Sequence, residues 1–466
     1  MEAFEIPTVL KQLITSNQAF HYRIVPVAEE HGDVILKTDT ADITSLASEM
    51  DIVLPFSSKL VAETRENMQS YLTYNYRQST TAQEELNSSN FLEMLLQTAK
   101  DYNSSDIHLE IYETHCRVRF RLDGKLKEQY HIPLSEYPLL INQIKIKAGL
   151  DISQKRLSQD GRITVNSASE DFDIRVSTMP TLYGEKVVLR ILQRNAEEVA
   201  LEQLGFNEQE LKRYLESVRL PNGIVLISGP TGSGKTTTLY GTLKQLNTED
   251  RNVLTIEDPI EYTLDGINQV QLQEAIGFDF PKALRTFLRQ DPDIIMVGEI
   301  RDEPTANMAI KAALTGHLVL STIHTNSAWA TISRLIDMGV PAYLLANTLN
   351  ASVAQRLVRL LCNHCKTQAA VTQALFPETF DQEHGLIHHW TATGCEHCYY
   401  TGYQGRKAVY EIIPITAALH GAIRSNQLDI SEYMQQNNLK TLKDNALSML
   451  KAGVTSIDEV YAILAS

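Results

Sequence analysis

The stretch "GPTGSGKT", residues 229–236, constrains the fold of this chain more than any other. It fits the pattern G-x-x-x-x-G-K-[ST], follows the apolar run "GIVLIS" and precedes the helix-compatible segment "TTTLYGTLKQL". A buried strand, a glycine-rich turn and a helix in this order form a phosphate-binding loop. The sequence therefore predicts an α/β core that binds a nucleotide.

In such a loop, backbone N–H groups and the positive end of the helix bind the phosphates. We expect Lys235 to reach the β- and γ-phosphates of ATP and the Thr236 hydroxyl to bind Mg²⁺. The alternative is a glycine-rich turn without a ligand. The residues expected to contact the nucleotide are Gly229, Pro230, Thr231, Gly232, Ser233, Gly234, Lys235, Thr236 and Thr237.

The length of the chain predicts several domains. At 466 residues it is too long for one hydrophobic core, and about three domains are expected. Apolar runs alternate with helical segments around the phosphate loop, which predicts a parallel sheet covered by helices on both faces. The expected segments are an N-terminal α/β docking domain over 1–76, a linker over 77–89, a second α/β domain over 90–200, the nucleotide-binding domain over 201–358, a cysteine-rich insertion over 359–400 and a helical region over 401–466.

The first two domains have their own predicted patterns. Residues 21–76 read as strand, strand, helix, strand and helix, with the third strand at "DIVLPFS", residues 51–57. In the second domain, alternation with period two marks the strands. A helix at "FLEMLLQTAKDY" precedes these strands, and another at "LLINQIKIKAGL" interrupts them.

The charge of the chain bears on its partners. A formal net charge of −15 argues against wrapping DNA or RNA, because such binding needs clustered lysines and arginines. The start "MEAFEIPTVL" lacks the features of a signal peptide, and no apolar run approaches the roughly 18 residues of a membrane span. We therefore expect a cytoplasmic protein that meets a membrane only by docking.

Two acidic segments are expected beside the phosphate loop. "TIEDPIEY" places Glu257 and Asp258 at the end of one apolar strand, and "IIMVGEIRD" places Glu299 at the end of another. Ligands of open α/β sheets bind at the carboxyl ends of the strands, so these acids should face Lys235. We expect Glu257 to position or activate water and Glu299 to lie on the magnesium side, although the two roles could be reversed. Such acids can also merely cap the following helix.

Two histidines flank the apolar run of "TGHLVLSTIHTNSA". His324, at the C-terminal end of the expected strand, is the better candidate for sensing the γ-phosphate. His317, at the other end, is expected to hold structure or an interface. A lone histidine is usually structural, so that interpretation stays open for both.

The segment "DIRVSTMPTLYGEKVVLRIL" reads as a hairpin with its turn around residues 180–184. If the hairpin is symmetric, Arg175 and Arg190 lie directly opposite each other. Opposed like charges are destabilising, so an anion such as a nucleotide phosphate is expected beside them. The alternative is a pair of solvated arginines on an asymmetric loop.

Four of the five cysteines form two C-x-x-C pairs, Cys362 with Cys365 and Cys395 with Cys398. Two such pairs complete the tetrahedral thiolate shell that zinc prefers and leave no open position, so we expect a structural zinc ion. The gap between the pairs is longer than the usual 15 to 20 or so residues. Redox-active dithiols are the main alternative.

Taken together, these segments resemble the secretion ATPases of the type II secretion and type IV pilus assembly family, the GspE/PilB type. The resemblance rests on "SSDIHLE", "RFRLDG", "QDGRI", "RVSTMPTLYGEKVVLRIL", "GPTGSGKTTTLY", "TIEDPIEY", "LRQDPDIIMVGEIRD", "TGHLVLSTIHTN" and the paired cysteines. It covers roughly residues 90–466. The fold it implies is a RecA-like P-loop NTPase core preceded by a PAS-like α/β domain, with a small N-terminal α/β domain and a zinc-binding insertion.

The resemblance also implies a function. It implies a cytoplasmic homohexameric ATPase that uses ATP, Mg²⁺ and Zn²⁺ and associates peripherally with the inner membrane through a platform protein and other assembly proteins, without nucleic acid. Glu257 falls in the family's aspartate box, Glu299 is its Walker B glutamate, His324 lies in its histidine box, and Arg175 and Arg190 match its phosphate-contacting arginines. ATP hydrolysis would drive rotation between domains. Type II secretion and pilus extension are not distinguished; a nucleic-acid translocase and a non-hydrolysing nucleotide-dependent scaffold are the alternatives.

Overall fold

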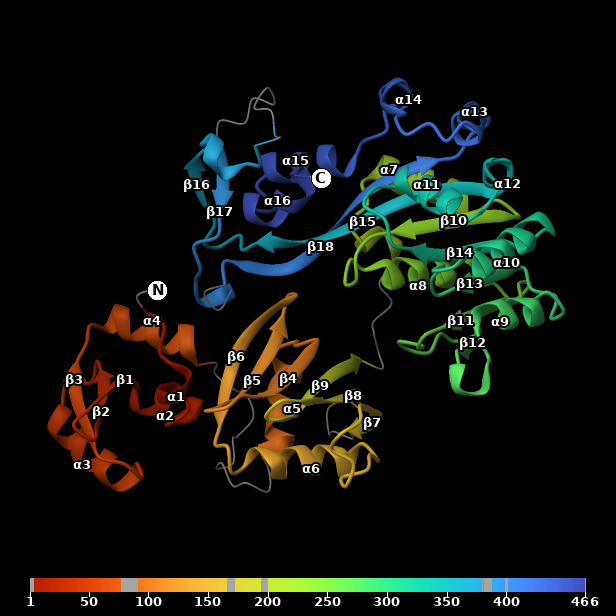
Figure 1. Ribbon diagram of the computed structural model, residues 1–466. Coiled ribbons are helices and arrows are strands. Elements are labelled where there is room, and N and C mark those ends of the chain that lie inside the picture. The colour runs from red at the N-terminus through yellow and green to blue at the C-terminus, as the bar shows by residue number, and fades with distance from the viewer. Residues whose placement is uncertain are drawn as a thin grey trace. The chain divides into compact units, whose positions relative to one another are not determined.

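The computed structural model describes residues 4–76, 91–165, 172–193, 200–378, 380, 388–398 and 401–465. The chain divides into two compact units, which are described separately (Figure 1). The first unit comprises Met1–Arg194, Cys362–Cys365 and Thr393–Tyr403, and the second comprises Asn195–Leu361, Lys366–Ala392 and Gln404–Ser466. The linker predicted over 77–89 lies outside the described residues.

The N-terminal part of the first unit has its own hydrophobic core and a three-stranded sheet of order β1-β2-β3. The elements are α1 (Thr8–Lys11), α2 (Ser16–Tyr22), β1 (Ile24–Glu30), β2 (Asp33–Thr38), α3 (Ile43–Val53), β3 (Ser58–Ala62) and α4 (Arg65–Asn75). The prediction of a strand over 51–57 is wrong. Helix α3 continues to Val53 because Leu46, Met50 and Leu54 recur every four residues and are all buried, and the strand follows later.

The rest of the first unit is built on a six-stranded antiparallel sheet of order β6-β5-β4-β9-β8-β7. Apolar side chains on one face of the sheet form a single core with helices α5 and α6, which lie along that face in Figure 1. The elements are α5 (Phe91–Asp101), β4 (Asp106–Ile111), β5 (Cys116–Leu122), β6 (Lys125–Ile132), α6 (Tyr137–Lys147), β7 (Gln159–Val165), β8 (Phe172–Thr181) and β9 (Gly184–Gln193).

The second unit contains a seven-stranded sheet of order β12-β11-β13-β14-β10-β15-β18. The pairs from β12 to β15 are parallel, as the sequence predicts. Alternate residues of β10 enter different cores: Ile224 and Leu226 pack with α9 and α10, whereas Val225 and Ile227 pack with α7 and α8. Both faces of the sheet are therefore covered, which confirms the expected layered α/β core.

The bounds of the elements of the second unit are α7 (Glu208–Val218), β10 (Gly223–Ser228), α8 (Lys235–Leu246), β11 (Val253–Glu257), β12 (Asn268–Gln271), α9 (Phe280–Phe287), β13 (Ile294–Val297), α10 (Glu303–Leu314), β14 (Leu318–Ile323), α11 (Ala330–Asp337), α12 (Ala342–Thr348), β15 (Leu349–Leu361), β16 (Thr367–Ala370), β17 (His388–Thr391), β18 (Tyr403–Pro414), α13 (His420–Arg424), α14 (Ser431–Gln436), α15 (Leu442–Lys451) and α16 (Ile457–Leu464). Among the helices of the described ranges, none combines the length and low polarity that a bilayer crossing needs.

Candidate functional site

The phosphate loop has the predicted strand, turn and helix. Strand β10 ends at Ser228, and helix α8 begins at Lys235. Gly234 precedes the helix with φ of +85°, a conformation that a residue with a side chain rarely adopts, and a Cβ atom there would lie 2.9 Å from Nε2 of Gln355. The left-handed backbone of the turn therefore favours glycine at this position.

Lys235 is the central cation of this loop. Its Nζ donates to the carbonyl oxygens of Gly229 at 2.8 Å and Pro230 at 3.0 Å. Burial lowers the pKa of Lys235 to about 8; Glu299 opposes this shift, and the neighbouring positive charge of Arg356 adds to it. A buried lysine with a depressed pKa gains free energy when an anion such as a phosphate binds beside it.

Glu299 follows the end of β13, as predicted. It lies close enough to Lys235 for its negative charge to oppose part of the fall in the pKa of Lys235 that burial causes. Its Oε1 is 2.5 Å from Nη2 of Arg301, and its Oε2 is 3.5 Å from Nε2 of His324. Three segments that are distant in sequence therefore meet at the carboxyl edge of the sheet, where a nucleotide is expected. Arg301 is a residue of this site that was not predicted from the sequence, although its place two residues after Glu299 in "GEIRD" was a usable signal.

Glu257 has different neighbours. Its side chain is buried and accepts hydrogen bonds from Tyr240, from Thr255 at 2.6 Å and from Gln269 at 3.1 Å. Tyr240 belongs to α8, so this carboxylate is connected to the helix of the phosphate loop. Its expected role in positioning water stays a prediction.

His317 and His324 differ as the sequence suggests. The ring of His324 is half exposed beside Glu299, whereas Nδ1 of His317 lies 2.8 Å from the carbonyl oxygen of Ala312 and 3.1 Å from Oγ1 of Thr315. His317 thus stabilises the turn between α10 and β14.

The arginine pair lies in the predicted register: Arg175 and Arg190 are directly opposite each other on β8 and β9. On the next strand Arg162 is opposite Arg175, and on β4 Asp106 is opposite Arg190. Asp106 accepts from Nε of Arg190 at 2.9 Å, and Arg162 forms an ion pair with Asp173 at 2.6 Å. Within the described part of the chain, Arg175 forms no ion pair. Arg175 therefore remains available to a bound anion.

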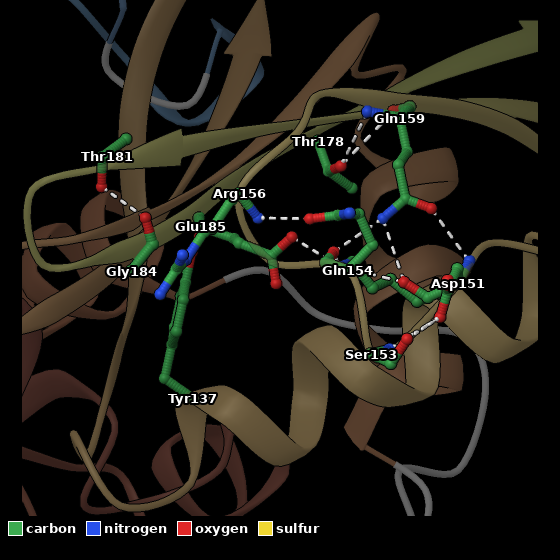
Figure 2. Close-up of polar contacts among 11 residues, drawn as sticks. Tyr137, Asp151, Ser153, Gln154, Arg156, Gln159, Thr178, Thr181, Gly184 and Glu185 are labelled. Carbon is green, nitrogen blue, oxygen red and sulfur yellow. Dashed lines mark hydrogen bonds and ion pairs between the residues drawn. The ribbon is translucent and has the colours of Figure 1, made fainter.

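Polar contacts within the turn of this hairpin and from helix α6 hold the turn, as Figure 2 shows. The Tyr137 hydroxyl donates to the carbonyl oxygen of Glu185 at 2.9 Å, and the Thr181 hydroxyl donates to that of Gly184 at 2.7 Å. Nζ of the fully buried Lys145 lies 2.5 Å from Oε1 of Glu185. These contacts fix the turn, and the turn fixes the register that places the arginines opposite each other.

The four paired cysteines converge in space, with all sulfur atoms within 4.8 Å of one another. The Sγ atoms of Cys362 and Cys395 are 3.8 Å apart, and those of Cys365 and Cys398 are 3.7 Å apart. Sulfur atoms at the corners of a tetrahedron with Zn–S bonds of about 2.3 Å are about 3.8 Å apart. The cluster thus fits a Cys₄ zinc site. The rings of His364 and His397 are tilted against each other by 31°, with centroids 4.0 Å apart.

Comparison with known sequences places this arrangement in a family. The profile of the family described as "Type II/IV secretion system protein" matches residues 81–462. The chain belongs to the type II/IV secretion system protein family. It is similar to the type IV pilus assembly ATPase PilB of Pseudomonas aeruginosa, with 46% identity over 378 residues, 80% of this chain and 67% of the relative. It is also similar to the putative type II secretion system protein E of Escherichia coli, with 44% identity over 370 residues, 79% and 75% of the two chains.

Solved structures share the fold of this chain. The fold resembles that of the ATPase DotB of Legionella pneumophila, with a TM-score of 0.62 and 21% identity over 83% of this chain and 98% of that one. It also resembles the pilus retraction motor PilT, solved with bound ADP, with a TM-score of 0.56 and 26% identity over 81% and 96% of the two chains. The chain therefore has the P-loop ATPase fold that the sequence predicts.

Proposed function

We propose that this chain hydrolyses ATP as the motor of a type II secretion or type IV pilus assembly machine. The observation that carries the proposal is the meeting of Lys235, Glu299 and His324 at the edge of the parallel sheet, in a member of the secretion ATPase family. Phosphoryl transfer to water needs a cation that binds the phosphates, a carboxylate beside the magnesium ion and a polar group that orients the attacking water.

Each group has a role in this proposal. Lys235 and the backbone of the loop bind the β- and γ-phosphates, and Thr236 and Glu299 hold Mg²⁺. Glu257 positions water, and His324 senses the γ-phosphate. Magnesium supplies positive charge that offsets the charge developing on the phosphates. Thr236 is exposed in the first turn of α8, which is compatible with this role.

We further propose a role for the arginine hairpin in binding nucleotide phosphates. Arg175 and Arg190 contact the phosphates, which explains why two arginines are tolerated in direct opposition. Asp106 forms ion pairs with both Arg190 and Arg121. Among the described residues, Arg175 forms no ion pair. A phosphate would provide the missing negative charge.

The assembly follows from the same proposal. The chain forms a homohexamer in the cytoplasm and reaches the inner membrane peripherally, through a platform protein and other assembly proteins. Hydrolysis rotates the domains against each other and moves the platform protein, which then raises pilin-like subunits. Nucleic acid is not a partner. The cysteine cluster holds a structural zinc ion.

The experiment that tests this function is ATP turnover measured on fractions of defined oligomer size, with and without the membrane platform protein. Turnover is expected in the hexameric fraction, with stimulation by the platform protein. Rings that fail to hydrolyse ATP under both conditions would refute the proposal.

Nucleotide binding should depend on pH through Lys235. Its pKa in the free protein is about 8, below the ordinary value, and a bound phosphate raises it by favouring the charged lysine. Affinity for ADP with Mg²⁺ is therefore expected to be constant below about pH 8 and to fall by up to about tenfold per pH unit above it. Titration calorimetry from about pH 7 to about pH 9.5 measures this. The variant Lys235→Arg, which keeps its charge throughout that range, should bind without this decline.

A further inference from the structure

The loop that follows β14 carries His324 and has no regular structure until α11 begins at Ala330. Side chains from neighbouring strands hold it in place. Ser228 of β10 donates to the carbonyl oxygen of Ser327 at 3.4 Å, and Ser352 of β15 donates to that of Ala328 at 2.6 Å. The C-terminal half of this loop is therefore held by the strands beside it.

Arg356 is the charged member of this set. It lies on β15, two residues beyond Ala354, which pairs with the last residue of β10. Its Nη2 donates to the carbonyl oxygen of Asn326 at 2.8 Å, and its Nη1 donates to that of Gln355 at 3.0 Å. One guanidinium thus joins β15 to the loop that carries His324.

The same guanidinium lies close to the start of the phosphate loop. A Cβ atom at Gly229, the first residue of that loop, would lie 3.1 Å from Nη1 of Arg356. Arg356 therefore packs against the start of the phosphate loop while it binds the loop after β14. Glycine at 229 is what allows this close approach.

The charge of Arg356 is not balanced by a direct ion pair within the described residues. Glu411 is near enough to act on it through space, but its two carboxylate oxygens accept from the backbone N–H groups of Ala328 and Leu442. A guanidinium group is rigid and planar. When it is partly buried and donates to backbone carbonyl oxygens, it fixes the position of those carbonyls.

We propose that Arg356 is a positioning residue of the nucleotide site, which holds the loop carrying His324 beside the first residue of the phosphate loop. This inference rests on the proposed ATP hydrolysis and adds a residue to it. Arg356 acts through His324: it keeps the imidazole in place beside Glu299 when the γ-phosphate is bound. Binding of ADP depends instead on Lys235 and the backbone of the phosphate loop.

The test uses the full-length chain and three variants, Arg356→Met, Arg356→Lys and Arg359→Met. Arg359 is a matched control because it lies on the same strand and pairs with Glu459 at 2.7 Å. Arg356→Met should accelerate amide hydrogen exchange over residues 324–328 at least about fivefold and reduce kcat about 10- to 100-fold, with ADP affinity changed by less than about threefold. Arg359→Met should change none of these three. In a His324→Ala background, Arg356→Met should reduce kcat by less than about twofold further.

Several results would overturn the inference. Unchanged hydrogen exchange over residues 324–328 in Arg356→Met would show that the hydrogen bond from Arg356 to Asn326 does not order the loop. A loss of ADP affinity as large as the loss of kcat would mean that Arg356 acts as a phosphate ligand. Full activity of Arg356→Lys would mean that charge alone suffices. An inactive wild-type hexamer would instead refute the proposed function, while the exchange measurement would still decide the role of Arg356.

Discussion

Replacement of Lys235 by alanine is expected to reduce ATP turnover at least about 100- to 1,000-fold, because one preorganised charge on the transferred phosphate is worth about that much. Lys235 is the cation at the phosphate loop, and burial already holds its pKa at about 8. The measurement is phosphate release at saturating ATP, combined with ADP binding.

The fold should survive this substitution. Alanine removes two hydrogen bonds to loop carbonyls, but it also removes a buried charge, so the two effects should offset to within about 1–2 kcal/mol. Lys244→Ala is the matched control, since Lys244 is exposed near the end of the same helix. Turnover that persists in Lys235→Ala, or disappears equally in Lys244→Ala, would contradict the site.

Loss of one zinc ligand is the second large effect we expect. In Cys395→Ser a hydroxyl replaces one of the four thiolates, so the purified chain should hold much less than one zinc per chain. Structural zinc contributes on the order of 10 kcal/mol to the folding of the segment it binds. Local unfolding of the cysteine-rich segment, followed by proteolysis near residues 362–398, is therefore expected.

Elemental analysis and limited proteolysis measure these two outcomes. Cys116→Ala is the control, because Cys116 is buried in β5 and belongs to the core of the six-stranded sheet. It should retain full zinc content. A wild-type chain that is stable without any metal would instead favour the redox interpretation of the cysteine pairs.

Part of the fold could be predicted because its signals are local. The phosphate loop combines a strand, three glycines in left-handed or similar conformations and a helix within a few residues. The opposed arginines followed from the symmetry of a hairpin, since its turn fixes the pairing. The third strand of the N-terminal domain was misplaced because the apolar residues of "DIVLPFS" fit both the helical period of 3.6 and the strand period of 2. Only the burial of Leu46, Met50 and Leu54 shows that the first residues of this segment belong to helix α3.

The sequence by itself determined the phosphate loop, the thiolate set and the family, because each depends on residue types at short fixed spacings. The tertiary structure alone decided which side chains meet. It brought Glu299 to His324, placed Glu257 against Tyr240 and Gln269, and placed Arg356 against Asn326 and close to Gly229. These contacts depend on the order and register of parallel strands that are distant in sequence, and no local spacing encodes that order.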